Sequence, residues 1–490
     1  KRSKQMKKRI LFCGEATYLN TGYATYLREV MKRLYATGKY ELAEFASYGR
    51  DEEAKKHGIP WTFYGNMPDK EEQEKYDEIP TNQFGEWRFE SVVLNFQPDI
   101  VCDIRDFWMF EYQERSPFRP YFHWVLMPTV DAAPQNEQWI STFSKESRGT
   151  INCLGSAPPS ADEAYKPVED KNKHKEEMGF SAGTKFVGTV MRNQRRKLFP
   201  DLFEMFSKFL ETSGRTDVYL YCHTSYPDLG WDIPKLLNKN RIASKVLFTY
   251  SCIQCQHAFP AFFSDARSKC PNCGSFSAGL SNVQKGVSYE YLSKIMNLFD
   301  LYIQYSNSEG FGLPQVEAAA CGVPVMSTDY SAMSSVVRKL GGTPLKPKAL
   351  YNELETGCNR AVPDNDDAAK KIKEFFENSD AQNETLSKNT RLNFEKYYQW
   401  DKTAKKWEDH FDSVEVVPGK WMSPPRVHTP VRNEQKEISN SEYARWLIIN
   451  VLGEPDKLNS YFESRLWNVY KWRWRNVSKR GLIQVCKACI

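Results

Sequence analysis

The chain has 490 residues, of which 41% are hydrophobic and 14% aromatic, and its formal net charge is only +5. A chain of this length is too long to fold around a single hydrophobic core. So small a net charge does not by itself indicate a class of binding partner. No stretch approaches the roughly 18 consecutive apolar residues of a membrane span, and the basic residues 1–9 lead into a strand without a signal peptide's apolar segment. We therefore expect a large cytoplasmic enzyme with two domains.

Strand and helix patterns alternate along the first third of the chain. Residues 9–14 form a short apolar run that ends in glycine, and an amphipathic helix follows the loop 14–23. Further buried strands are expected at 99–104, 121–127 and 150–154. His123 falls within one of these runs and is expected in the core. Ligands of such sheets bind beyond the carboxyl ends of the strands, which is where Asp131 stands.

A second series of alternating elements begins after a charged segment at 169–177. Its strands are expected at 185–190, 217–222, 245–250 and 301–305, with helices of suitable length between them. Two such series in one chain predict an α/β protein with two doubly wound, Rossmann-like domains.

The most informative segment is 308–325, which reads SEGFGLPQVEAAACGVPV. Gly310 and Gly312 allow the backbone to approach a ligand, and the helix that follows directs its positive end at a diphosphate. Glu309 before the turn and Glu317 in the helix can accept hydrogen bonds from sugar and ribose hydroxyls. The pattern indicates a sugar-nucleotide site; the alternative is an ordinary strand–loop–helix unit with solvated glutamates.

This segment closely resembles the E-x7-E signature of retaining GT-B glycosyltransferases of family 4. The resemblance covers roughly residues 9–410 and implies a GT-B fold, in which two Rossmann-like domains face a cleft. It implies that Glu309 contacts the transferred sugar and that Glu317 contacts the ribose. It also implies that the nucleotide site includes the turn residues Gly310, Phe311, Gly312 and Leu313.

Arg192 and Lys197 have the spacing of the same family's R-x4-K loop. Two positive charges there can neutralise a departing diphosphate without a divalent metal ion. Arg195 and Arg196 lie between them and leave open which side chain reaches the ligand; a solvated basic loop is the alternative reading.

Three further residues are candidates through the resemblance. Gly22 lies in a loop similar to the family's first glycine-containing loop, which faces the cleft. His223 falls in a segment similar to the family's His-Thr turn. Both a structural role and a nucleotide-binding role remain open for it. Many members carry a histidine at the end of one N-domain strand; this sequence departs from them, and we expect Asp131 to take that place, orienting an acceptor hydroxyl or supporting positive charge.

The resemblance also suggests domain boundaries. Residues 399–407 resemble the family's terminal helix, which crosses back onto the N-terminal domain. We assign an N-terminal acceptor-side domain to 1–170, a nucleotide-sugar domain to 171–395 with an insertion at 251–285, the crossover helix to 396–415 and a C-terminal extension to 416–490.

The insertion carries two C-x-x-C pairs with the spacing of a zinc ribbon, namely Cys252, Cys255, Cys270 and Cys273. Four thiolates fill a tetrahedral shell and leave no position for a catalytic water, so the predicted zinc is structural. The alternative, two disulfides, is disfavoured by the expected cytoplasmic location. Since the ribbon follows the strand 245–250 directly, it projects from the carboxyl side of the sheet, where it either contacts an acceptor or only decorates the fold.

The last part of the chain is basic and aromatic. From Arg465 onward it has no acidic residue and carries seven cations, with Trp467, Tyr470, Trp472 and Trp474 between them. Such a pattern is typical of nucleic-acid binding, and also of a membrane-surface helix or of a helix that packs on the enzyme itself. Cys486 and Cys489 form a third pair that has no partner pair nearby.

Together these features predict a retaining glycosyltransferase that uses a nucleoside-diphosphate sugar, expected to be UDP-linked. The ribbon and the tail favour DNA carrying 5-hydroxymethylcytosine as the acceptor. The whole chain is similar to bacteriophage glycosyltransferases that modify the phage's own DNA in the host cytoplasm. One alternative is a saccharide or lipid-linked acceptor in surface-polymer synthesis. Another is a nucleic-acid-binding protein on an inactive glycosyltransferase scaffold.

Overall fold

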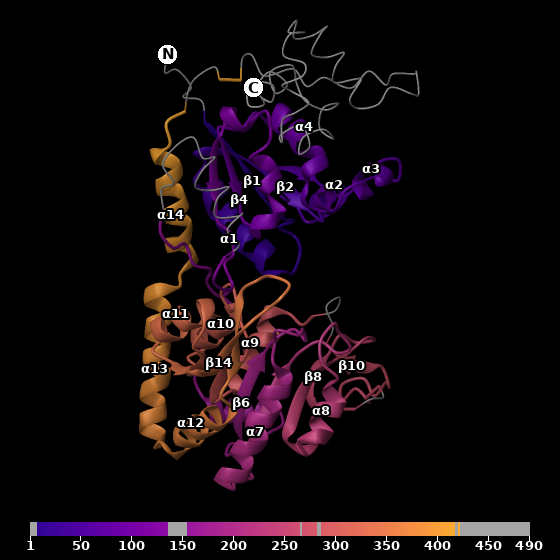
Figure 1. Cartoon of the computed structure of the whole chain (residues 1–490). Coiled ribbons are helices and arrows are strands. Elements are labelled where there is room, and N and C mark those ends of the chain that lie inside the picture. Colours follow the sequence, from indigo (N-terminus) through magenta and orange to yellow (C-terminus); the bar gives the residue numbers. More distant parts are fainter. Residues whose placement is uncertain (1–6, 136–153, 265–266, 282–285, 417–419, 422–490) are drawn as a thin grey trace, which may run out of the picture. The chain divides into compact units, whose positions relative to one another are not determined.

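A computed structural model describes residues 7–135, 154–264, 267–281, 286–416 and 420–421 (Figure 1). The described residues divide into two compact units, one formed by those up to residue 128 and from residue 410 onward, and the other by those between 129 and 409. The sequence placed the first boundary at residue 170, but the segment before it packs within the second unit. Ser160 Oγ donates to the carbonyl of Tyr398 at 2.8 Å, and Tyr165 is buried in that unit's core. Residues 150–153 of one predicted strand lie outside the described residues.

The first unit contains a five-stranded parallel sheet in the order β3-β2-β1-β4-β5. The strands are β1 (Lys8–Glu15), β2 (Tyr40–Ser47), β3 (Thr62–Gly65), β4 (Ile100–Asp103) and β5 (His123–Leu126). Three of them, β1, β4 and β5, confirm predicted strands. The sequence analysis did not identify β2 and β3, because Glu44 interrupts the apolar run of β2. That carboxylate is fully buried and accepts hydrogen bonds from the backbone and hydroxyl of Thr17 and from Trp61.

The helices of this unit are α1 (Gly22–Ala36), α2 (Asp51–Lys56), α3 (Gln73–Asp77) and α4 (Glu86–Phe96), with short 3-10 turns at Pro80–Phe84, Phe107–Met109, Glu111–Gln113 and Arg119–Tyr121. Thr21 caps α1 by accepting a hydrogen bond from the Ala24 amide at 3.2 Å. The expectation that His123 lies in the core was wrong. It starts the edge strand β5, is exposed, and its ring lies 5.5 Å from that of His410.

The first unit also includes the end of α14 (Trp400–Ser413) and the start of the C-terminal extension. Phe411 packs edge-on against Phe12 and Tyr40, with ring centroids 5.9 Å apart in both pairs. Trp421 donates to the carbonyl of Pro98 at 3.0 Å and lies 4.9 Å from the ring of Tyr121. The beginning of the extension is therefore part of this unit's core, whereas the basic aromatic segment from Arg465 lies outside the described residues.

The second unit contains an eight-stranded sheet whose main path is β10-β8-β7-β6-β11-β12-β13, with β9 also paired to β8. Its strands are β6 (Lys185–Val190), β7 (Val218–His223), β8 (Val246–Cys252), β9 (Ala258–Phe262), β10 (Ala278–Leu280), β11 (Leu301–Gln304), β12 (Val325–Thr328) and β13 (Thr343–Leu345). The central strands are parallel, and β9 and β10 run antiparallel to β8. A separate hairpin consists of β14 (Pro347–Asn352) and β15 (Asn359–Pro363).

The helices of the second unit are α6 (Lys171–Glu177), α7 (Phe199–Ser213), α8 (Ile233–Lys239), α9 (Tyr289–Leu298), α10 (Leu313–Ala320), α11 (Ser331–Lys339), α12 (Asn365–Glu377), α13 (Asp380–Tyr397) and most of α14, with a 3-10 turn at Ala243–Lys245. Within the described residues no helix is long and apolar enough to cross a membrane.

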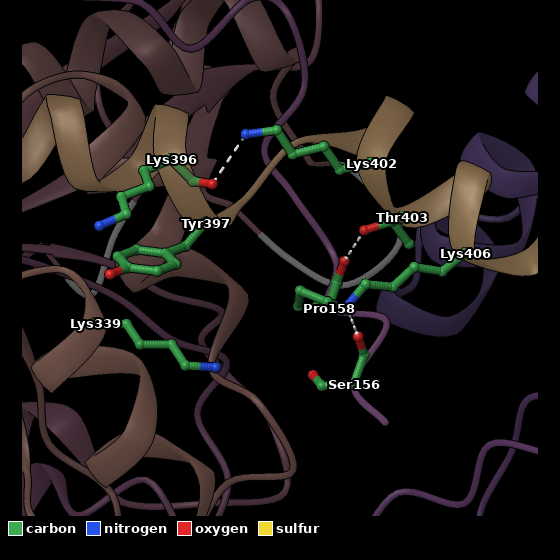
Figure 2. A pocket seen from close by; sticks show the side chains of 8 residues that line it. All are labelled: Ser156, Pro158, Lys339, Lys396, Tyr397, Lys402, Thr403 and Lys406. Carbon is green, nitrogen blue, oxygen red and sulfur yellow. Dashed lines mark hydrogen bonds between the residues drawn. The ribbon is translucent and has the colours of Figure 1, made fainter. Parts of the chain in front are cut away.

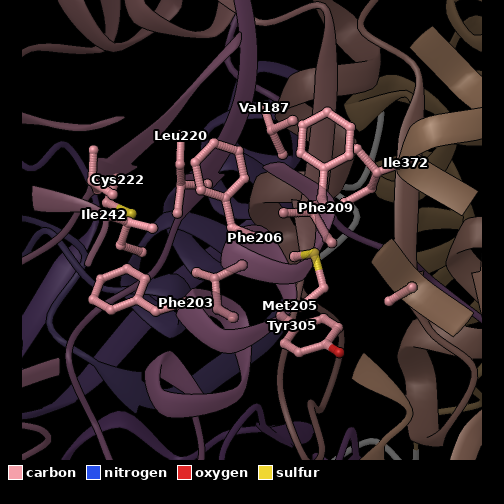
Figure 3. Close-up of a cluster of buried hydrophobic side chains, with 14 of the residues drawn as sticks. Val187, Phe203, Met205, Phe206, Phe209, Leu220, Cys222, Ile242, Tyr305 and Ile372 are labelled. Carbon is pink, nitrogen blue, oxygen red and sulfur yellow. The ribbon is translucent and has the colours of Figure 1, made fainter. Parts of the chain in front are cut away.

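The core of the second unit forms between α7 and the sheet (Figure 3). Phe203, Phe206 and Phe209 of α7 are fully buried against strand residues such as Leu220 and against Ile372 of α12. Removing one such aromatic side chain costs about 3–5 kcal/mol, because the cavity left behind closes only in part. The packing of α7 and α12 on the sheet fixes the strand ends that form the site described below.

Candidate functional site

The turn between β11 and α10 is held tightly in place. Gly312 caps α10 with φ +83°, a conformation that favours glycine. A Cβ atom at Gly310 would lie 2.0 Å from the side chain of Thr129, so this backbone also approaches its neighbour too closely for any other residue. The Glu309 amide donates to Ser331 Oγ at 2.9 Å. The predicted turn, and the helix start near Pro314, are therefore present as the sequence indicated.

Glu309 lies at the centre of a buried polar cluster. Only 5% of it is exposed, and its Oε1 accepts hydrogen bonds from Lys197 Nζ, from Ser306 Oγ at 2.8 Å and from Gln304 Nε2 at 3.2 Å. Arg196 Nη1 donates to Oε2 at 2.6 Å. Burial alone would raise the pKa of Glu309, but the charges of Lys197 and Arg196 outweigh it and lower this pKa to about 2. The carboxylate is therefore ionised at any physiological pH and acts only as an acceptor.

The loop 191–197 supplies these cations, but its two predicted residues have different partners. Lys197 is buried against Glu309, whereas the side chain of Arg192 is 43% exposed and forms a bidentate pair with Asp228, at 2.8 and 3.0 Å. The hydrogen bonds from Arg192 are the main cause that lowers the pKa of Asp228 to about 2. Sequence reasoning left open which arginine accompanies Lys197, and the structure brings Arg196 to Glu309.

The loop at residues 230–231 fixes the position of the cationic loop 191–197. Asn193 Oδ1 accepts from the Trp231 amide at 2.8 Å, and Asn193 Nδ2 donates to the Trp231 carbonyl at 2.8 Å. A Cβ at Gly230 would lie 2.3 Å from Asn193, so this close contact requires glycine. The cationic loop is thus locked before any ligand binds.

Glu317, on α10, is 7% exposed and buried near Tyr165. Burial raises its pKa to about 7; the Tyr165 side chain lowers the pKa and the charge of Asp162 raises it. Between Glu309 and Glu317, Phe311 packs edge-on to Tyr398 with ring centroids 5.8 Å apart. The two glutamates therefore have opposite electrostatic environments, one ionised and the other titrating near neutrality.

His223 and Gly22 have less specific surroundings. His223 ends β7, its Nδ1 is 2.9 Å from Thr249 Oγ1, and burial lowers its pKa to about 4, so the ring is neutral. Gly22 begins α1 in the first unit, and a Cβ there would meet nothing within 4 Å. Neither observation assigns a role, and their part in nucleotide binding stays a prediction.

Asp131 is paired with a residue that the sequence analysis missed. It lies five residues beyond the end of β5, and its Oδ2 accepts from Arg360 Nη1 at 2.8 Å and from Ser308 Oγ at 3.4 Å. Ser308 immediately precedes Glu309, so Asp131 stands beside the glutamate turn. Arg360 comes from the hairpin, outside every motif, and no sequence signal marked it.

The four cysteines of the insertion lie together at the end of β8, as predicted. Their sulfur atoms all lie within 4.8 Å of one another, and the pairs Cys252–Cys273 and Cys255–Cys270 are each 3.6 Å apart. This spacing is too long for a disulfide bond and close to the ~3.8 Å edge of a tetrahedral ZnS4 site. Ser277 Oγ lies 3.1 Å from the sulfur of Cys252 and can support a thiolate there. The residues present therefore fit zinc.

A hollow of about 230 Å³ lies where α13 passes into α14, and four lysines line it (Figure 2). Lys402 donates to the carbonyls of Glu395 and Lys396, and Lys406 donates to that of Ser156. Thr403 bonds the carbonyl of Pro158 at 2.6 Å. These contacts join α14 to the end of α13 and to the segment at 156–158, and none of the predicted site residues lines the hollow.

Comparison with known proteins identifies part of the chain and the fold. Residues 280–393, which include both glutamates of the turn, match the sequence model of the family described as "Glycosyl transferases group 1". No curated protein matches the chain in sequence.

Several solved structures are similar to it. Sucrose-phosphate synthase from Thermosynechococcus elongatus is 14% identical with a TM-score of 0.57, and the match covers 83% of this chain and 98% of that one. Anabaena HepE in complex with UDP and glucose is 13% identical with a TM-score of 0.54, over 83% of this chain and all of the other. A trehalose-6-phosphate protein from E. coli bound with UDP-2-fluoro glucose is 11% identical with a TM-score of 0.51, over 84% and 100%. With its two Rossmann-like sheets, the chain has the GT-B glycosyltransferase fold.

Proposed function

We propose that this protein is a retaining glycosyltransferase that moves a sugar from a nucleoside-diphosphate sugar to an acceptor hydroxyl. The observation that carries the proposal is the buried, ionised Glu309 in the turn before α10, held between Lys197 and Arg196, with Glu317 on the helix that follows. The match of residues 280–393 to a glycosyltransferase family supports it, since that segment contains both glutamates.

The donor's diphosphate binds at the amino end of α10, where the amides of the Gly310–Gly312 turn and the helix dipole favour negative charge. Lys197, Arg196 and Arg192 add the positive charge that stabilises the leaving diphosphate. Glu309 accepts hydrogen bonds from hydroxyls of the transferred sugar, and Glu317 accepts them from the ribose. UDP is the expected nucleotide, because two structures with this fold contain UDP or a UDP sugar.

Transfer occurs on the face of the sugar that the diphosphate leaves. The bond between the anomeric carbon and the phosphate oxygen breaks, the acceptor oxygen bonds to that carbon, and the acceptor's proton passes to the departing diphosphate. Asp131, beside the glutamate turn, supports positive charge on the anomeric carbon or orients the acceptor hydroxyl. The cations make a divalent metal ion unnecessary, and zinc on the four cysteines stabilises the insertion.

For the acceptor we propose 5-hydroxymethylcytosine in DNA. The support is sequence alone: the basic aromatic segment from Arg465, together with the ribbon, has the composition of a surface that follows a phosphate backbone and stacks bases. A saccharide or lipid-linked acceptor is the competing possibility.

A transfer assay tests both parts. Purified protein is incubated with isotope-labelled UDP-, ADP- and GDP-sugars and with 5-hydroxymethylcytosine DNA, unmodified DNA or oligosaccharides, and products are identified by mass spectrometry, with the anomer assigned by NMR. We expect an α-configured product from a UDP-α-sugar on hydroxymethylated DNA only. Magnesium chelation should leave activity unchanged, and Glu309→Gln should abolish it.

Each outcome decides between the alternatives. Transfer to oligosaccharides but not to DNA would replace the acceptor while keeping the enzyme class. Absence of transfer and of donor hydrolysis with every sugar nucleotide would indicate an inactive scaffold and refute the proposal.

A further inference from the structure

All three guanidinium nitrogens of Arg360, near the glutamate turn, bond to carboxylates. Arg360 lies on β15 with 7% of its surface exposed. One edge of its guanidinium, Nε and Nη2, faces Glu353 Oε2 at 2.9 and 2.8 Å. From the other edge, Nη1 donates to Asp131 Oδ2 at 2.8 Å and to Ser308 Oγ. A single side chain therefore joins the hairpin, the segment around Asp131 and the residue before Glu309.

These contacts fix the orientation of Asp131. Its Oδ2 is held by Arg360 and Ser308, whereas no described residue donates a hydrogen bond to its Oδ1. The side chain is still 40% exposed. The carboxylate thus has one oxygen that is anchored and one that is available to a ligand.

Backbone hydrogen bonds extend the same connection to the cationic loop. The Ala361 amide donates to the carbonyl of Asn307 at 3.0 Å, and the Asn307 amide donates to the carbonyl of Arg196 at 3.0 Å. On its other side, β15 reaches the Asp131 segment, because the Asn359 amide donates to the carbonyl of Ala133 at 2.9 Å. The hairpin is therefore bonded to both groups that the proposed reaction needs beside the donor sugar.

We infer that Arg360 is a positioning residue that acts on the transfer step through Asp131. The inference rests on the proposed function. It also explains why Arg360, a charged residue of the hairpin, is buried beside Asp131. By anchoring one oxygen, Arg360 keeps the Asp131 carboxylate at a fixed position beside Ser308 and Glu309. A negative charge fixed in advance stabilises a developing positive charge better than one that must reorganise.

Arginine suits this role better than lysine. Its planar fork presents donors to Glu353 on one edge and to Asp131 on the other at the same time. A lysine ammonium is a single point of charge and cannot span both carboxylates. Arg360→Lys should therefore preserve the charge and the fold while it loses the orientation of Asp131.

The test is a double-mutant cycle measured as UDP-glucose hydrolysis and transfer. Wild type, Arg360→Lys, Arg360→Met, Asp131→Asn and the two double variants are compared for kcat and KM, with UDP binding by calorimetry and the melting temperature alongside. Arg338→Met is the matched control, because Arg338 pairs with Asp329 on the exposed face of α11.

We expect kcat to fall at least tenfold in Arg360→Lys, Arg360→Met and Asp131→Asn, with UDP affinity within twofold of wild type. Adding either Arg360 substitution to Asp131→Asn should change kcat less than twofold. Arg338→Met should retain wild-type kcat.

Three outcomes would overturn the inference. They are unchanged kcat in the Arg360 variants, unchanged kcat in Asp131→Asn, and equal losses from Arg360→Lys in both backgrounds with a parallel fall in UDP affinity, which would indicate a structural role. A wild-type protein that binds and consumes none of the UDP-, ADP- and GDP-sugars refutes the proposed function itself, and the inference with it.

Discussion

Lys197→Met removes the buried cation that bonds Glu309 and leaves a side chain of similar length. In the intact protein the pKa of Glu309 falls from 4.5 to about 2. At ~1.36 kcal/mol per pKa unit, this corresponds to about 3 kcal/mol of stability at pH 7. Arg196, which donates to Glu309 Oε2 at 2.6 Å in the intact protein, should offset part of the loss. We therefore expect the free energy of unfolding to fall by ~2 kcal/mol, less than for a buried charge left with no partner at all.

The lowered pKa of Glu309 also predicts how the stability loss in Lys197→Met depends on pH. A carboxylate whose pKa is lowered by folding stabilises the protein above pH 4.5 and loses this contribution as the pH falls toward 2. The deficit of Lys197→Met should therefore be largest at pH 7 and should shrink toward pH 3.

Denaturant unfolding at pH 7 and pH 3 measures these effects, and the control is the same substitution in a Glu309→Gln background. Without the carboxylate no buried charge is left unpaired, so Lys197→Met should there cost less than about 1 kcal/mol. Equal costs in the two backgrounds, or a deficit at pH 7 below about 1 kcal/mol, would refute the reasoning.

Three other predictions concern the donor, the metal and the tail. Because the pKa of Glu317 is raised to about 7, its ionised fraction grows about tenfold between pH 6 and pH 8, and UDP affinity measured by calorimetry should rise accordingly, with Glu317→Gln showing no such dependence. Metal analysis should find about one zinc per chain and none in Cys270→Ser; a disulfide in the mass spectrum would contradict this. Truncation after residue 464 should weaken duplex-DNA binding and flatten its salt dependence without changing UDP affinity. A lower melting temperature with an unchanged salt slope would show instead that the tail's tryptophans pack on the enzyme.

Local pattern was sufficient wherever chemistry lies on neighbouring residues of one segment. The turn before α10 was predicted because Gly310 and Gly312 are required by its backbone and Glu309 and Glu317 flank it. The cysteine cluster was predicted for a similar reason, since two C-x-x-C knuckles bring four sulfurs together once the flanking strands pair. Apolar runs likewise indicated β1, β4, β6, β7, β8 and β11, because strands buried on both faces are apolar along their length.

Other features depend on partners that are distant in the sequence. The strand β2 contains a buried glutamate, and only Thr17 and Trp61 make Glu44 tolerable inside the sheet. His123 is exposed because β5 lies at the sheet edge, a place that strand order alone decides.

The sequence by itself determined the class of fold, the glycine turn between the two glutamates and the cysteine site, because each depends on short-range spacing. Only the tertiary structure decided how the charges pair. Arg192 bonds Asp228, Arg196 joins Lys197 at Glu309, and Arg360 holds Asp131 from a hairpin more than 200 residues away in the chain. Charged side chains on loops have no periodicity that reveals their partners. Which ones meet follows from the packing of the strands and helices that carry them, and burial then sets the strength of each pair.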